Sequence, residues 1–133
     1  KVPSGSCEDS VSFLPALSGE KIKSTRKGLI HHSISGHFAY RMGKWKLLLA
    51  KASGGWSSPK ENQVKAGAPR AQLYDMERDI GEQKNLYENE PEIASAILLQ
   101  LERDVRRGRS MDGPKSKNDI AEIELWKSLS NRD

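Results

Sequence analysis

Apolar and polar residues alternate in the first half of the chain, in stretches that lie close together. Every second side chain is apolar in residues 38–42 and 45–50, and a third β-like stretch, 28–34, precedes them. Because successive side chains of a strand point to opposite faces, this alternation predicts strands with one buried and one solvent face. Glycine-containing pairs at 35–36 and 43–44 fit two-residue hairpin turns. The pattern predicts an antiparallel meander, with residues 72–75 as a short fourth strand.

A different period marks the second half of the chain. Between residues 91 and 107, apolar side chains recur at helical spacing, acidic residues crowd the start and arginines the end. Pro91 suits the first helical position and Gly108 the position just after the last. A short helix is also expected within 10–19, capped by Asp9 or Ser10 and ended by Gly19. A second short helix is expected over 119–129.

These elements predict an α+β fold, a small four-stranded antiparallel sheet with a packed C-terminal helix. The length of 133 residues fits one domain, since domains run to roughly 100–200 residues. We expect a lead-in with a short helix (1–25), the sheet (26–75) with a long loop (53–70), the main helix (91–107) and a polar tail (109–133). A loop of that length is usually functional or disordered.

Charge and composition exclude several classes of protein. The net charge of +4 comes from 22 basic and 18 acidic residues that are interleaved along the chain, and no nucleic-acid-binding motif is present. We therefore expect no nucleic-acid partner. No apolar run reaches the roughly 18 residues of a membrane span, so no span is expected. Residue 1 is Lys, and we expect the chain to be cut from a longer one.

Few side chains offer chemistry. The single cysteine, Cys7, has no cationic neighbour in sequence that would favour its thiolate. His31 and His32 are consecutive in a predicted strand and so point to opposite faces, which leaves at most two histidines for one metal ion. The acidic residues of 75–82 do not have EF-hand spacing, and turn capping is expected of them. The residues by themselves thus predict no catalytic and no metal site.

Three ordered segments nevertheless carry a family resemblance. Residues 72–86, Gln-Leu-Tyr-Asp-Met-Glu-Arg-Asp-Ile-Gly-Glu-Gln-Lys-Asn-Leu, resemble the C-terminal signature of the formylglycine-dependent, arylsulfatase-like sulfatases. Residues 9–19 are similar to that family's Asp-Gly-x-Ser-Leu-Leu-Pro-Leu-Leu-x-Gly segment, with Ser10 in place of Gly. Residues 36–47 resemble its Gly-x-Phe-Ala-x-Arg-x-Gly-x-Trp-Lys-Leu hairpin, and 53–57 one of its loops.

The resemblance covers only the C-terminal quarter or so of a sulfatase. It implies a four-stranded sheet with a helix, in agreement with the periodicities. Cys7 does not match the Cys-x-Pro/Ala-x-Arg motif whose cysteine becomes formylglycine. The resemblance therefore implies that calcium and formylglycine belong to an N-terminal catalytic domain outside this chain, and that no cofactor and no catalytic residue lie here. It also implies a periplasmic or secreted protein.

On this resemblance, the chain is expected to be inactive alone and to supply structure and substrate-rim contacts to a sulfatase. His31, His32 and His37 are candidates to donate to sulfate or hydroxyl oxygens. Trp56 is a candidate to stack on a sugar or aryl group, or else to pack against the N-terminal domain. The expected partners are that domain and a sulfated small molecule or glycan.

Two alternatives remain open from the residues. The basic outer face of the predicted hairpin, with Arg41, Lys44 and Lys46, fits a non-catalytic module that binds polyanions or sulfated glycans. A purely structural domain is the other, in which an apolar face completes the core of a larger neighbour.

Overall fold

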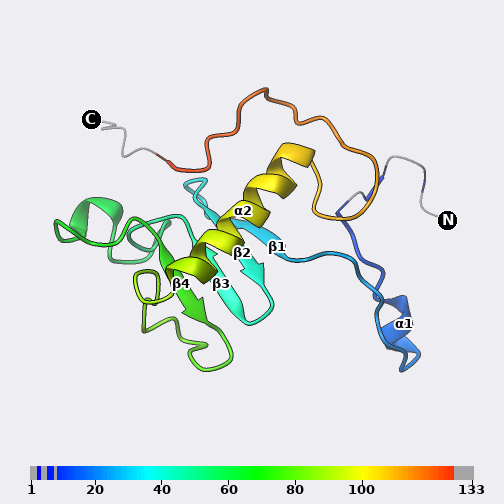
Figure 1. Ribbon diagram of the computed structural model, residues 1–133, viewed down its shortest axis with the longest axis horizontal. Coiled ribbons are helices and arrows are strands. Elements are labelled where there is room, and N and C mark those ends of the chain that lie inside the picture. The colour runs from blue at the N-terminus through cyan, green and yellow to red at the C-terminus, as the bar shows by residue number, and fades with distance from the viewer. Residues whose placement is uncertain (1–2, 4–5, 8, 128–133) are drawn as a thin grey trace.

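A computed structural model describes residues 3, 6–7 and 9–127. Its centre is an antiparallel sheet in which the four strands lie in chain order, with a long helix, α2 (Pro91–Arg107), across one face (Figure 1). The strands are β1 (Leu29–His32), β2 (Phe38–Met42), β3 (Trp45–Leu48) and β4 (Gln72–Asp75). The predicted α+β fold is thus confirmed.

Helix α2 has the predicted bounds because both of its ends are specified locally. Pro91 lies in the first turn, where its missing N–H costs nothing. At the other end Gly108 adopts a left-handed conformation (φ 68°). The N–H of Arg109 then donates to the Asp104 carbonyl, which ends the helix.

The core lies between α2 and the sheet. The strand register places Tyr40, Leu47 and Leu73 side by side on the face that α2 covers. From the helix, Ile97 and Leu101 pack onto this row with no exposed surface. Alternate residues of each strand therefore form the core, as the period of two predicts.

One polar contact is buried in this core. The Tyr40 hydroxyl donates to Asp104 Oδ2 at 2.5 Å, and Gln100 Nε2 donates to Asp104 Oδ1 at 2.8 Å. Burial, followed by the hydrogen bond to Asp104, raises the pKa of the Tyr40 hydroxyl above its usual range. The contact joins α2 to β2, and both carboxylate oxygens have a donor.

The lead-in forms an arm that extends away from the sheet and carries the short helix α1 (Leu14–Leu17) (Figure 1). The expected cap at Asp9 or Ser10 was wrong. The helix begins later, after Phe13, with no side-chain cap, and it ends before Gly19 (φ 75°). The Asp9 carboxylate instead accepts the hydroxyl of Ser110 at 2.8 Å, so it joins the arm to the segment after α2.

The helix expected over 119–129 is absent from residues 119–127; residues 128–129 lie outside the described residues. Ile123 and Leu125, two positions apart, are both half-buried against the core, whereas Ile120 is exposed. That spacing belongs to extended chain. Trp126 lies against the core too, with the Arg70 guanidinium 3.5 Å above its ring. Packing against the body therefore overrides the weak helical pattern.

Candidate functional site

The face of the sheet opposite α2 is not covered by any described element and forms the floor of a groove of about 780 Å³. The loop after β3, including residues 51–53 and 57–59, makes one wall. The turn after β4, including residues 80–82, makes the other. The volume is in the range of small-molecule sites, roughly 300–1,000 Å³.

Two rows of side chains cross this floor. The strand register aligns His31 with Ala39, Leu48 and Gln72, and it aligns Arg41 with Lys46 and Tyr74. These residues alternate with the core residues along each strand and so point away from α2. The part of the floor formed by β1 to β3 consequently carries basic side chains. The part formed by β4 carries the amide of Gln72 and the phenol of Tyr74.

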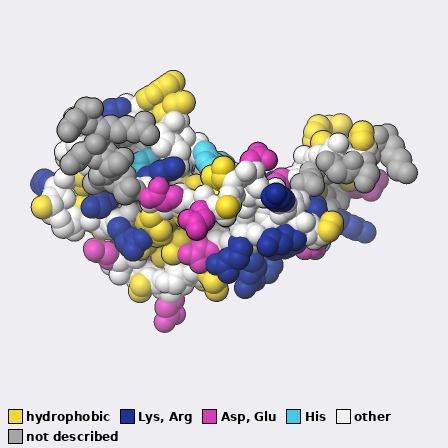
Figure 2. All heavy atoms as spheres, turned by 90° about the horizontal axis from the view of Figure 1, so that it is seen from above, with side chains coloured by type: hydrophobic (Ala, Val, Ile, Leu, Met, Phe, Trp, Pro, Cys, Tyr) yellow, Lys and Arg dark blue, Asp and Glu magenta, His cyan; other side chains and the backbone are white. Residues whose placement is uncertain are grey.

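His31 lies among cationic neighbours. Partial burial lowers the pKa of its imidazole, and the positive charges of Lys46 and Arg41 lower it further. The ring is therefore predominantly neutral at neutral pH. In Figure 2, histidine side chains lie beside lysine and arginine side chains on the body of the molecule.

His37 is buried at the inner end of the groove. Its ring Nδ1 lies 3.2 Å from the Leu49 carbonyl oxygen, and because a carbonyl only accepts, Nδ1 is the donor of this hydrogen bond. The Ser33 hydroxyl accepts its backbone N–H at 3.0 Å. No hydrogen bond of Nε2 occurs among the described residues, which leaves that nitrogen available to a ligand.

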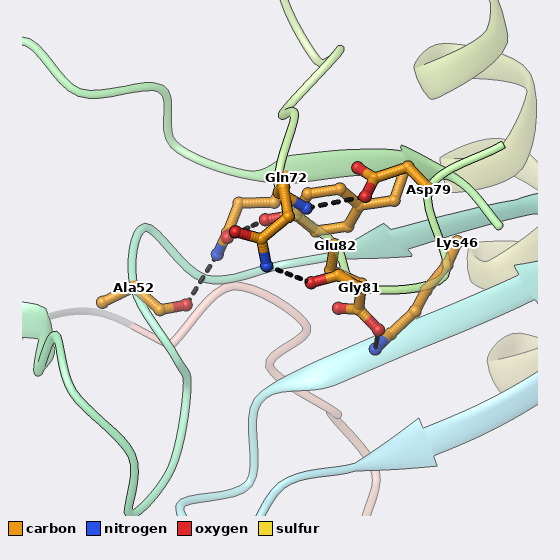
Figure 3. A network of polar contacts seen from close by, with 8 residues as sticks. Lys46, Ala52, Gln72, Asp79, Gly81 and Glu82 are labelled. Carbon is orange, nitrogen blue, oxygen red and sulfur yellow. Dashed lines mark hydrogen bonds and ion pairs between the residues drawn. The ribbon is translucent and has the colours of Figure 1, made fainter.

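A polar network closes the β4 side of the groove (Figure 3). Gln72 Nε2 donates to the Ala50 and Ala52 carbonyls at 2.9 and 2.6 Å, and its Oε1 accepts the Tyr74 hydroxyl. Lys46 Nζ lies 2.6 Å from Glu82 Oε1. Burial, and next Glu82 and Asp79, raise the pKa of Tyr74. These groups bind one another and fix the shape of the groove.

Arg41 differs from these paired groups. Its Nε donates to the Gly43 carbonyl at 2.8 Å, which orients the guanidinium. Its two terminal nitrogens have no hydrogen bond within the described part of the chain. A guanidinium with two free, parallel donors is suited to a bidentate oxyanion.

The long loop 53–70 is held by its own side chains. The Glu61 carboxylate accepts the backbone N–H groups of Lys51, Ala52 and Gly54, at 3.1, 3.0 and 3.3 Å. Lys60 Nζ donates to the carbonyls of Gly55 and Trp56. The Trp56 side chain is 82% exposed and does not line the groove.

The structure thus places His31, His32 and His37 in the lining of one groove and leaves Trp56 outside it. The ring of His32 packs on Phe38, with ring centroids 4.1 Å apart, on the α2 side of the sheet. Sequence reasoning missed Gln72, Tyr74 and Glu82 as groove residues. The alternation of β4 carried the signal for the first two, but the position of Glu82 depends on how the following turn folds back.

The turn-capping role predicted for the acidic residues after β4 is confirmed for Asp75 and Asp79, but it was wrong for Glu82, which binds Lys46 instead. Asp79 accepts the backbone N–H groups of Gln83 and Lys84 at 2.9 and 2.8 Å, and these bonds lower its pKa. The Lys44 ammonium, 2.7 Å from Asp75 Oδ2, is the main cause of the lowered pKa of that carboxyl.

Within residues 3, 6–7 and 9–127, no group of three histidine, cysteine or acidic side chains is placed to hold a metal ion. Cys7 is exposed and forms no disulfide. No helix in the described ranges combines the length and apolar character that a membrane crossing needs.

Comparison with known proteins gives a structural likeness only. No family model and no curated protein matches the chain. Among solved structures, the fold is similar to part of a Bacteroides thetaiotaomicron sulfatase from work on that organism's metabolism of multiple glycosaminoglycans, with a TM-score of 0.56 and 23% identity. The match covers 77% of this chain and 21% of that chain, so this chain spans about a fifth of the sulfatase's length.

Proposed function

We propose that this chain is the C-terminal part of a sulfatase, an enzyme that hydrolyses sulfate esters, and that it supplies structural support and substrate-rim contacts. The proposal rests on the agreement between the sequence motifs, in their order along the chain, and the fold. The segments 9–19, 36–47 and 72–86 resemble sulfatase motifs in sequence. The chain that contains them is similar in fold to part of a Bacteroides sulfatase.

The reacting groups are assigned to a catalytic domain outside this chain. Cys7 is followed by Glu8-Asp9-Ser10-Val11, which departs from the motif that yields formylglycine. The described residues do not fit a calcium site either. Under this proposal, residues 1–133 carry out no step of sulfate hydrolysis. The calcium ion and formylglycine are proposed for the N-terminal part of the parent protein, and a periplasmic or secreted location is proposed with them.

The groove and the loop beside it are proposed as the rim of the substrate site. His31 and His37 offer ring nitrogens to sulfate or hydroxyl oxygens of a sulfated small molecule or glycan. Trp56 offers an exposed indole face on a loop that Glu61 and Lys60 hold. His32 is proposed only as a contact at the outer edge of β1, because its ring packs on Phe38.

The first experiment separates this chain from its parent. The purified 133-residue chain is expected to give no turnover of an aryl sulfate above background. A parent protein that carries a Cys-x-Pro/Ala-x-Arg segment upstream is expected to hydrolyse it. Turnover by the isolated chain would refute the assignment of the chemistry elsewhere, and a parent without that segment would refute the sulfatase proposal.

The rim contact is tested in the active parent. Trp56→Ala is expected to raise KM by about tenfold with a smaller change in kcat, since a stacking contact made equally in the ground and transition states affects binding alone. Leu99→Ala, at an exposed position of α2, is the matched control and is expected to leave both constants unchanged. Equal effects of the two variants would remove the stacking role.

The polyanion-binding alternative has less support. It needs the charges of Arg41, Lys44 and Lys46, but Lys44 and Lys46 each lie within 2.7 Å of a carboxylate oxygen. These pairs neutralise two of the three charges locally, and we do not adopt a general polyanion surface as the function.

A further inference from the structure

The groove on the open face of the sheet carries more positive than negative charge. Three cationic side chains line it, and one carboxylate opposes them, which leaves 3 − 1 = +2 before any histidine is protonated. The cations are Arg41, Lys46 and Lys51, and the carboxylate is Glu82. A groove with this excess, lined by the low-dielectric surface of a sheet, concentrates anions.

The cations are not equivalent. Lys46 is bound to Glu82 at 2.6 Å, and Lys51 is exposed on the loop wall. Arg41 lies on β2 next to Lys46 on β3, oriented through Nε by the Gly43 carbonyl. Its two terminal nitrogens form no hydrogen bond with any described residue, so they remain available as donors. A sulfate or carboxylate group offers two oxygens in the matching geometry.

His31 completes the cluster. In the strand register Arg41 is paired with Leu29, and His31 lies two residues after Leu29 on β1. His31 is therefore on the same face of the sheet as Arg41. Partial burial, and next the positive charges of Lys46 and Arg41, lower the pKa of the His31 imidazole. An oxyanion bound by Arg41 offsets the positive charge of that guanidinium, which is one of the charges that lower the His31 pKa. The ring then takes up a proton and becomes a second charged donor.

We propose that Arg41 and His31, beside the Lys46–Glu82 ion pair, form an anion subsite on the open face of the sheet, which takes one sulfate or carboxylate group of a sugar. The identity of the sugar rests on the proposed function, whereas binding of the anion does not. Because binding is coupled to protonation of His31, affinity increases as the pH falls. The other ionisable residues that line the groove are His32, His37, Lys51, Tyr74 and Glu82.

The test follows the titration of His31 by NMR in the isolated chain. With sodium sulfate, the His31 pKa is expected to rise by about one unit relative to sodium chloride at matched ionic strength. The His31 resonance is assigned with His31→Gln. An identical His31 titration in the two salts would overturn the proposal.

Charge-matched variants separate a built site from general screening. Arg41→Gln is expected to abolish the sulfate-dependent shift, whereas Lys44→Gln, which removes the same charge from a residue that does not line the groove, is expected to keep it. Equal losses in both variants would overturn the proposal. Arg41→Lys keeps the positive charge at this position but removes the two parallel donors of the guanidinium. It is expected to retain less than half of the shift, and a full shift would refute bidentate binding by Arg41.

The source of the anion is distinguished with a monosulfated glucose. Tighter binding than inorganic sulfate assigns the subsite to a sulfated sugar, and equal binding of the two assigns it to the anion alone. Failure of this inference and failure of the proposed function are separable. The NMR readout needs no turnover, while the sulfatase assignment is decided by aryl sulfate hydrolysis in the parent.

Discussion

The two faces of the sheet are built from alternate residues of the same strands, yet they differ in what satisfies their side chains. Leu47 is 1% exposed and packs with Ile97 and Leu101 beneath α2. Its neighbour Leu48 is half-buried on the floor of the open groove. One residue along β3 therefore separates a position in the core from a position beside solvent.

Polar groups follow the same division. On the covered face, Asp104 receives donors on both oxygens, because an unpaired group there would lose its hydration without compensation. On the open face, Arg41 keeps two free nitrogens that water satisfies at little cost. The difference indicates that the covered face determines stability, while the open face, where we propose binding, keeps side-chain donors unoccupied by other described residues.

The largest expected effect tests this division directly. Leu47→Ala is expected to lower the free energy of unfolding by about 3 kcal/mol, through lost apolar burial and the cavity that remains. Leu48→Ala, the same change one residue later, is expected to cost about 1 kcal/mol because its side chain already contacts solvent. Urea denaturation measures both. Equal costs would show that the open face is as much a core as the covered one.

The next effect concerns how closely the backbone approaches the covered face. A Cβ at Gly28 would overlap the Tyr40 ring and lie 2.6 Å from the Arg41 carbonyl oxygen. Gly28→Ala is therefore expected to destabilise the fold by about 2 kcal/mol. At Gly55, in the loop beside the groove, the nearest atom to a Cβ is 3.8 Å away. Gly55→Ala serves as the control, and its urea midpoint is expected to stay close to that of the parent chain.

Much of this architecture could be predicted from periodicity. The strand stretches and the bounds of α2 follow from apolar spacing and from Pro91 and Gly108, signals that are local in sequence. The segment 119–127 was predicted wrongly because its few apolar residues fit two periods. Contact with the body, through Trp126 and Arg70, decided between them. Such a tertiary contact leaves no local pattern.

The groove was less accessible to sequence reasoning. His31 and His37 stand out by residue type, but their shared face depends on the register between β1 and β2. Glu82 reaches Lys46 from 36 positions away, and Glu61 reaches back to Lys51, in the loop after β3. Long-range pairings of this kind are set by the fold as a whole.

Two tyrosines, one from each face, extend the comparison to alkaline pH. The pKa of both hydroxyls is raised, chiefly by burial. A raised pKa in the folded state contributes stability below the unfolded value of about 10, and this contribution is lost as the pH rises above it. Tyr40→Phe is expected to cost about 1 kcal/mol at neutral pH, since Asp104 loses a donor.

Phenylalanine variants of the two tyrosines are also expected to change how steeply the free energy of unfolding falls above pH 10. Denaturation at several pH values measures this dependence. Tyr40→Phe is expected to remove more of the alkaline loss of stability than Tyr74→Phe, because Tyr40 is fully buried and also donates to a carboxylate. A larger change in Tyr74→Phe would contradict the stronger coupling assigned to the covered face.

The smallest effect is confined to the wall of the groove. Glu61→Gln keeps one acceptor oxygen but loses the charge that holds three backbone N–H groups. The global free energy of unfolding is expected to change by less than about 0.5 kcal/mol, as for most surface substitutions. Amide hydrogen exchange at Lys51, Ala52 and Gly54 is expected to accelerate by about tenfold, because local opening requires only that these bonds break.

Glu77→Gln is the matched control, since it removes the same charge from an exposed turn residue. It is expected to leave the exchange at Lys51, Ala52 and Gly54 unchanged. If Glu61→Gln instead lowered global stability as much as Leu47→Ala, the loop would be an extension of the core. The open face would then owe its shape to the same cooperative unit as the covered face, and a separate, locally adjustable binding wall would no longer describe it.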